Sequence, residues 1–151
     1  VNFIMSGGNL FINPIDFEDT TFTWFPLDSL ATLNPNGRLF PGTVIESPVD
    51  SNLNLSISHL ISVKVKGFWP NVSEFENVQT IYQMPVPEGN QPWSGTPTVC
   101  SIGQYRVSPI ELSGKVVIMT LPLHDGYRPK LQGNGSAIKL IEYLLENEFI
   151  R

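Results

Sequence analysis

The sequence predicts a mainly β protein, an antiparallel β-sandwich or barrel with one C-terminal α-helix. Polar and apolar side chains alternate along residues 53–65, as they do in a strand with one buried face. The chain also carries 13 Pro and 12 Gly, which interrupt helices and mark the turns between strands. Only residues 136–149 repeat their apolar side chains with a helical period. We expect residues 1–19 to form an N-terminal arm and residues 20–151 a single β-rich domain.

The N-terminal third contains short apolar runs separated by turn residues. In the arm, Leu10–Ile12 is expected to be a short strand between a Gly-Gly pair and an Asn-Pro pair. Thr20–Phe25 alternates β-branched and aromatic residues, which predicts a strand that ends at Pro26. Thr43–Glu46 is predicted to be another short strand.

The strongest strand signal begins at Leu53. Every second residue from there is apolar or nearly so, and most of the intervening residues are polar. Such a pattern predicts a long strand with one buried face and one wet face, and therefore an antiparallel sheet. Because its length exceeds that of most strands, we expect a bend or bulge near residues 58–60. The row expected to face the core is Leu53, Leu55, Ile57, His59, Ile61, Val63 and Val65.

The second half of the chain predicts further strands around one long loop. Val78–Met84 resembles a strand, and residues 84–98 hold four prolines and two glycines, which no regular element tolerates. Val99–Ile102 and Gln104–Val107 are expected to be two short strands. Lys115–Leu121 is a nearly continuous apolar run, which is typical of a strand buried on both faces.

The C-terminal residues predict the one helix. Ser136 can cap it, and the following residues place a broad apolar stripe on one side. Three acids near its C-terminal end oppose the helix dipole, so we expect the last turn to fray unless a partner covers it. The stripe consists of Ile138, Ile141, Leu144, Leu145 and Phe149.

Composition excludes several classes of protein. Charged residues make up 15% of the chain, below the usual ~25%, and the net charge is -5. An acidic chain lacks the clustered basic surface of a nucleic-acid binder, and no apolar run is long enough for a transmembrane helix. The single cysteine, Cys100, rules out an intrachain disulfide scaffold and is typical of a reducing compartment.

The sequence contains few residues that could form a catalytic site. The two histidines, His59 and His124, are far apart in the sequence, and Cys100 sits in no nucleophile signature. Asp16, Glu18 and Asp19 lack the spacing of a calcium loop, and no glycine-rich phosphate motif occurs. We therefore expect no enzyme activity, no cofactor and no metal site.

Large apolar side chains in the arm and in loops are the candidate interface residues. Trp69 and Trp93 lie among Pro and Gly, where a large side chain is less easily buried than in a strand. In the arm, Phe3, Ile4 and Phe11 are expected to dock on an adjacent subunit. The alternative is that each tryptophan folds back over the sheet as a lid.

Low charge, long proline-rich loops, an N-terminal arm and a fraying C-terminal helix suggest a subunit that is ordered by its neighbours. In composition and layout the chain resembles the accessory β-domains of virus and bacteriophage particles, such as capsid decoration, spike or protruding, neck and baseplate proteins. The resemblance implies a non-catalytic virion component, assembled in the host cytoplasm, whose partners are other copies and neighbouring structural proteins. The alternative function is a carbohydrate-binding β-sandwich module that uses Trp69, Trp93 and Tyr127 to bind glycans.

Overall fold

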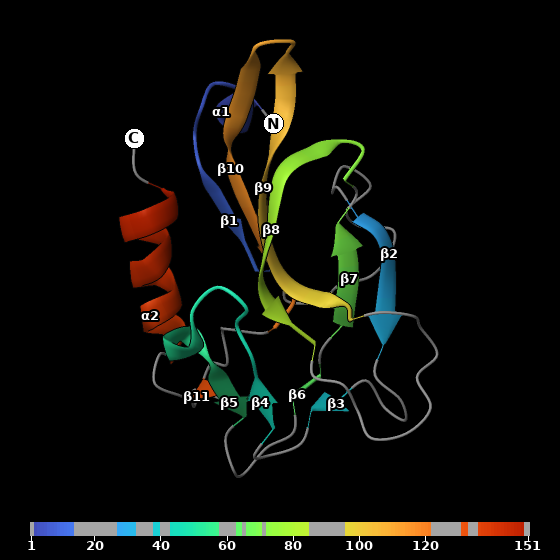
Figure 1. Cartoon of the computed structure of the whole chain (residues 1–151), viewed down its shortest axis with the longest axis vertical. Coiled ribbons are helices and arrows are strands. Elements are labelled where there is room, and N and C mark those ends of the chain that lie inside the picture. Colours follow the sequence, from blue (N-terminus) through green and yellow to red (C-terminus); the bar gives the residue numbers. More distant parts are fainter. Residues whose placement is uncertain are drawn as a thin grey trace.

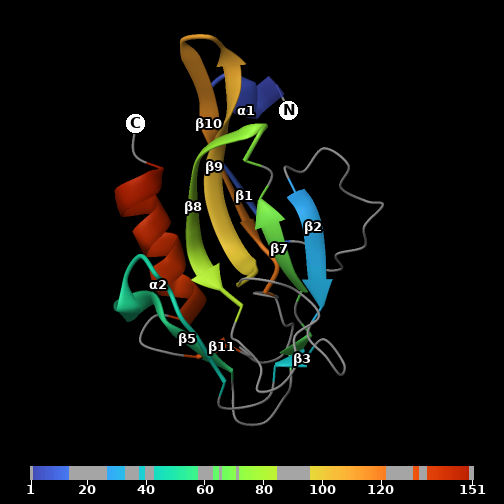
Figure 2. The same ribbon diagram turned by 45° about the vertical axis from the view of Figure 1, so that its right-hand side comes forward.

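The computed structural model confirms a mainly β protein with a C-terminal helix (Figures 1 and 2). In the part of the chain that the structure describes, the strands form three separate sheets and none closes into a barrel. The described residues are 2–13, 27–32, 38–39, 43–57, 63–64, 66–70, 72–84, 96–121, 131–132 and 136–149.

The main sheet is built around β9 (Thr98–Ser108), which is paired on both edges. One edge pairs with β10 (Glu111–Met119), and the other with β8 (Phe75–Gln83). At Thr98, β9 also meets β7 (Lys66–Pro70), which continues the sheet to β2 (Leu27–Thr32). The far side of β10 pairs in parallel with β1 (Leu10–Ile12), so the main sheet is mixed, although its other pairs are antiparallel.

Two smaller sheets lie at one end of the main sheet (Figure 1). The first has the order β11 (Leu131–Gln132), β5 (Leu55–Ile57) and β4 (Val44–Ile45), and all its pairs are antiparallel. The second pairs β3 (Arg38–Leu39) with β6 (Val63–Lys64).

A core cluster fills each face of the main sheet. The larger cluster contains Val117 and Met119 of β10 together with residues of the small sheet and of the C-terminal helix. In the smaller cluster, Val116 and Ile118 of β10 pack with Ile4, Phe68 and Phe75. The alternation along β10 therefore buries both faces of the strand, as its apolar run predicts.

The C-terminal helix runs along the face of the sheet that carries the larger cluster. It begins as α2 (Ser136–Tyr143) and continues as a π-helical turn, η2 (Leu144–Glu148). Leu140 and Leu144 are its buried contacts, whereas Ile138, Ile141 and Leu145 are exposed. The predicted stripe is therefore wrong in part, because the helix packs through its narrow i, i+4 row and leaves three large apolar residues outside.

The single long strand predicted over residues 53–65 is wrong. Asp50 accepts a hydrogen bond from the Asn52 backbone N–H at 2.8 Å, which caps a 3₁₀ turn, η1 (Ser51–Leu53), ahead of β5. Downstream, β5 and β6 belong to different sheets. Leu53 and Leu55 are nevertheless buried, as predicted for the row of alternate residues that faces the core.

Residues 2–13 do not form a free arm but pack against the main sheet. Residues Asn2–Met5 form a short helix, α1, which buries Ile4 in the smaller core cluster. After β1, the Asn13 side-chain amide donates hydrogen bonds to the carbonyls of Met119 and Leu121 at 2.8 and 2.5 Å. These contacts make the segment an edge of the main sheet.

Other strand predictions have mixed outcomes. β1, β4, β8 and β10 confirm the predicted strands at those places, with boundaries shifted by a few residues. The two short strands expected between residues 99 and 107 are one continuous strand, β9. The predicted strand Thr20–Phe25, the boundary at residue 19 and most of the 84–98 loop lie outside the described residues.

Candidate functional site

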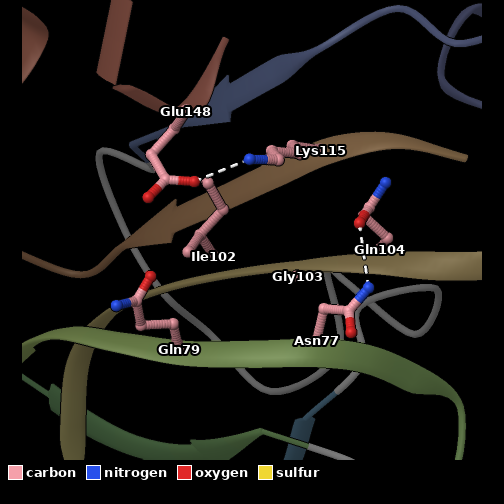
Figure 3. A pocket seen from close by; sticks show the side chains of 7 residues that line it. All are labelled: Asn77, Gln79, Ile102, Gly103, Gln104, Lys115 and Glu148. Carbon is pink, nitrogen blue, oxygen red and sulfur yellow. Dashed lines mark hydrogen bonds and ion pairs between the residues drawn. The ribbon is translucent and has the colours of Figure 1, made fainter. Parts of the chain in front are cut away.

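A polar groove opens on the helix-bearing face of the main sheet, beyond the end of the larger core cluster (Figure 3). It has a volume of about 290 Å³, and strands β8, β9 and β10 form its floor and sides. The last turn of η2 reaches over it. The residues that line it are Asn77, Gln79, Ile102, Gly103, Gln104, Lys115 and Glu148.

Two β-bulges lie at the groove, one on each side of β9. In β8, the register with β9 slips by one residue between Glu76 and Gln79, and Asn77 adopts a left-handed backbone with φ of 53°. In β10, the register slips in the same way between Leu112 and Lys115. A bulge redirects side chains and increases the local twist, so these two slips decide which side chains point into the groove.

The side chain of Gln104 bridges the two bulges. Its carbonyl oxygen accepts a hydrogen bond from the Asn77 side-chain amide at 3.2 Å. Its own amide donates to the Ser113 carbonyl at 2.8 Å. The Ser113 hydroxyl in turn accepts from the Tyr105 backbone N–H at 2.8 Å. This network holds the side-chain amides of Asn77 and Gln104 at fixed positions in the groove.

The π-helical turn supplies the acidic wall. Its wide turn is closed by the Phe149 backbone N–H, which donates to the Leu144 carbonyl at 2.6 Å. Glu148 there forms an ion pair with Lys115, with 2.7 Å between Nζ and Oε2, and accepts a hydrogen bond from the Tyr143 hydroxyl at 3.2 Å. The ion pair neutralises one of the three acids that were expected to fray the helix end.

The electrostatics of this wall keep Tyr143 neutral. Burial raises the pKa of Tyr143, and the adjacent Glu148 carboxylate raises it further. The neutral Tyr143 hydroxyl donates one hydrogen bond to the Glu148 carboxylate, and Lys115 donates a second. The groove thus presents side-chain amides, one cation and one anion, with no net charge.

The predicted interface residues lie in different environments. Phe3 on α1 is exposed, whereas Ile4 is buried and Phe11 packs against the larger core cluster. Ile4 is therefore unavailable to a neighbouring subunit, because the fold itself covers it. Trp69 is half-buried on β7, and Trp93 lies outside the described residues. Of these five residues, the four that the structure describes do not line the groove.

Comparisons of the chain with protein-family models, curated proteins and solved structures find no match. In the described ranges, no three His, Cys, Asp or Glu side chains gather as metal ligands would. Nor does any helix among those residues have the length and apolar character needed to cross a membrane.

The other candidates of the sequence divide between buried and undescribed residues. Cys100 is completely buried in the larger core cluster, where burial raises the pKa of its thiol. His59, His124, Tyr127 and the acids at 16, 18 and 19 lie outside the described residues.

We predict that Cys100 resists thiol reagents while the protein is folded. A raised thiol pKa leaves little thiolate to react, and no solvent reaches the sulfur. A disulfide reagent at pH 8 should modify Cys100 at the rate of global unfolding, and immediately in denaturant. Rapid modification of the folded chain would show that the Cys100 sulfur is accessible.

The groove residues were not identified from the sequence. Asn77, Gln79 and Gln104 are amides in strands, and Lys115 and Glu148 are ordinary surface charges until the fold brings them together. No sequence motif marks the two β-bulges that orient these side chains. The only hint was the acidic end of the helix, which needs a cation nearby.

Proposed function

We propose that the chain is a non-catalytic structural protein of a larger assembly, a component of a virus or bacteriophage particle that acts through protein–protein contacts. The observation that supports this is the outer face of α2 and η2. Ile138, Ile141 and Leu145 are 69%, 40% and 59% exposed there, in a row beside the buried Leu140 and Leu144. A helix in a free-standing domain usually keeps that side polar, so an apolar row indicates a contact surface.

This outer face is complementary to itself. Two copies of the helix packed antiparallel about a point near Ile141 would place Ile138 of each copy against Leu145 of the other. Lys139 lies well round the helix from this row and stays outside the contact. The antiparallel arrangement also sets each acidic helix end beside the positive end of its partner's dipole. We therefore expect a second copy of the chain as the first partner.

A second contact surface lies at the projecting end of the β9–β10 hairpin (Figures 1 and 2). Ile110 in the hairpin turn is 97% exposed, and Phe3 and Val107 are exposed too. Two separate apolar surfaces allow a subunit to contact both its own copies and a neighbouring structural protein.

The helix pairing is tested by sedimentation of the purified chain over a concentration series. The parent should self-associate, whereas Leu145→Asp should sediment as a monomer with an unchanged circular dichroism spectrum. Lys139→Glu is the matched control: it reverses a charge on the same helix outside the apolar row and should change association by less than about threefold.

The control distinguishes packing through the apolar row from a general effect of added negative charge. A loss of association in Lys139→Glu as large as in Leu145→Asp would contradict pairing through Ile138, Ile141 and Leu145. A parent chain that stays monomeric at every concentration, and forms no particles by electron microscopy, would contradict self-assembly itself.

A further inference from the structure

Three departures from regular backbone meet at the polar groove. They are the bulge in β8 with Asn77 in the left-handed region, the bulge in β10, and the π-helical turn that carries Glu148. Each costs stability relative to an uninterrupted strand or helix, and each type is concentrated at functional sites in proteins. The contact surfaces of α2 and the hairpin do not involve these lining residues, so assembly does not explain them.

We propose that this groove binds a neutral saccharide unit through its hydroxyl groups. The amides of Asn77, Gln79 and Gln104 offer both donors and acceptors, which is what a hydroxyl needs from its partners. The Gln79 side-chain amide is exposed at the groove and forms no hydrogen bond with the other described residues that line it (Figure 3). Ile102 and the backbone of Gly103 provide an apolar floor for the C–H face of a sugar ring.

The charges of the groove favour a neutral ligand. The charge of Lys115 is already balanced by Glu148 at 2.7 Å, so an anionic ligand gains little net attraction from the lysine and is repelled by the carboxylate. A hydroxyl can instead donate to Glu148 and accept from Lys115 without breaking the pair. The volume of about 290 Å³ is at the lower end of small-molecule sites, which suits one sugar ring.

This inference goes beyond the proposed assembly role and uses different residues from it. It also differs from the tryptophan-based glycan site that the sequence suggested, because the groove is lined by side-chain amides and one ion pair, and Trp69 is not among its described lining residues. The helix-face variant Leu145→Asp should therefore leave saccharide binding unchanged.

The experiment is a nuclear magnetic resonance titration of the isotope-labelled full chain. A panel of neutral monosaccharides and disaccharides is added, with a sugar phosphate and an amino acid as charged probes. We expect at least one neutral saccharide to shift the side-chain amide signals of Asn77, Gln79 and Gln104 in a saturable way. The charged probes should leave these signals unmoved.

Two glutamines on the same strand provide a matched pair of variants. Gln79→Ala removes an amide from the groove and should weaken binding by about threefold to tenfold, the effect of one hydrogen bond. Gln83→Ala makes the same change at an exposed position of β8 outside the groove and should bind as the parent does. Both variants should keep the parent's melting temperature.

Several results would overturn the proposal. They are a neutral panel that moves none of the three amides, a charged probe that binds in preference, and a Gln79→Ala variant with undiminished affinity. Shifts confined to the surroundings of Trp69 would place glycan binding on the tryptophans instead.

Discussion

Replacing Leu140 with aspartate is expected to unfold the protein. The Leu140 side chain is completely buried in the larger core cluster, where α2 meets the main sheet. A carboxylate there would lose its hydration without gaining a partner, and the leucine's own burial of ~2–3 kcal/mol would be lost as well. The sum approaches the whole stability of an ordinary domain, ~5–15 kcal/mol. Circular dichroism should show loss of cooperative unfolding.

Ile138→Asp is the matched control, two residues earlier on the same helix. Ile138 is 69% exposed, and an acid in the first turn of a helix interacts favourably with its dipole. Its thermal midpoint should stay close to the parent's, although self-association should weaken. Equal midpoints for both aspartate variants would mean that α2 does not pack on the sheet through Leu140.

The second large effect is expected for Phe75→Ala, on the opposite face of the sheet. Phe75 is buried in the smaller core cluster, and its ring lies so close to Gly103 that a Cβ added there would be 2.5 Å away. It also packs against Tyr105, with the ring centroids 5.1 Å apart. Truncation of a buried phenylalanine typically costs ~3–5 kcal/mol. Chemical denaturation should give a midpoint lowered accordingly.

Val72→Ala is the control for that measurement, since Val72 is 70% exposed just before β8. Because Ile4 of α1 belongs to the same cluster as Phe75, hydrogen exchange of the N-terminal segment should accelerate in Phe75→Ala only. A destabilisation below about 1 kcal/mol would show that this cluster is not a core.

Local pattern was sufficient to predict most of the strands but not how they combine. The apolar run of β10 and the alternation around Leu53 and Leu55 predict burial correctly, because side-chain direction follows from backbone period alone. The predicted long strand is wrong because β5 and β6 join different sheets, and because the Asp50 cap places Leu53 in a 3₁₀ turn ahead of β5. Alternation along one segment does not reveal which sheets its two ends will join.

The groove was beyond prediction for a different reason. Its residues come from three strands and a helix, and two bulges decide which way their side chains point. Bulges at Asn77 and at Ser113 depend on the partner strand β9 as much as on their own sequence. Of the predicted interface residues, Phe3 is exposed on α1 and Ile4 is buried in the smaller core cluster, while Phe11 on β1 packs against the larger one.

The pairing of β1 with β10 also has a consequence for the order of folding. β9 and β10 are joined by a tight turn and can zip together locally, whereas the Asn9 side chain meets the Lys115 backbone across 106 residues of chain. Closing so long a loop costs more entropy, so β1 should join last and detach first. While the parallel edge of β10 is vacant, it can accept the first strand of another copy as readily as its own. Exchange of that strand between copies would link subunits through the same contacts that β1 and β10 form within one chain.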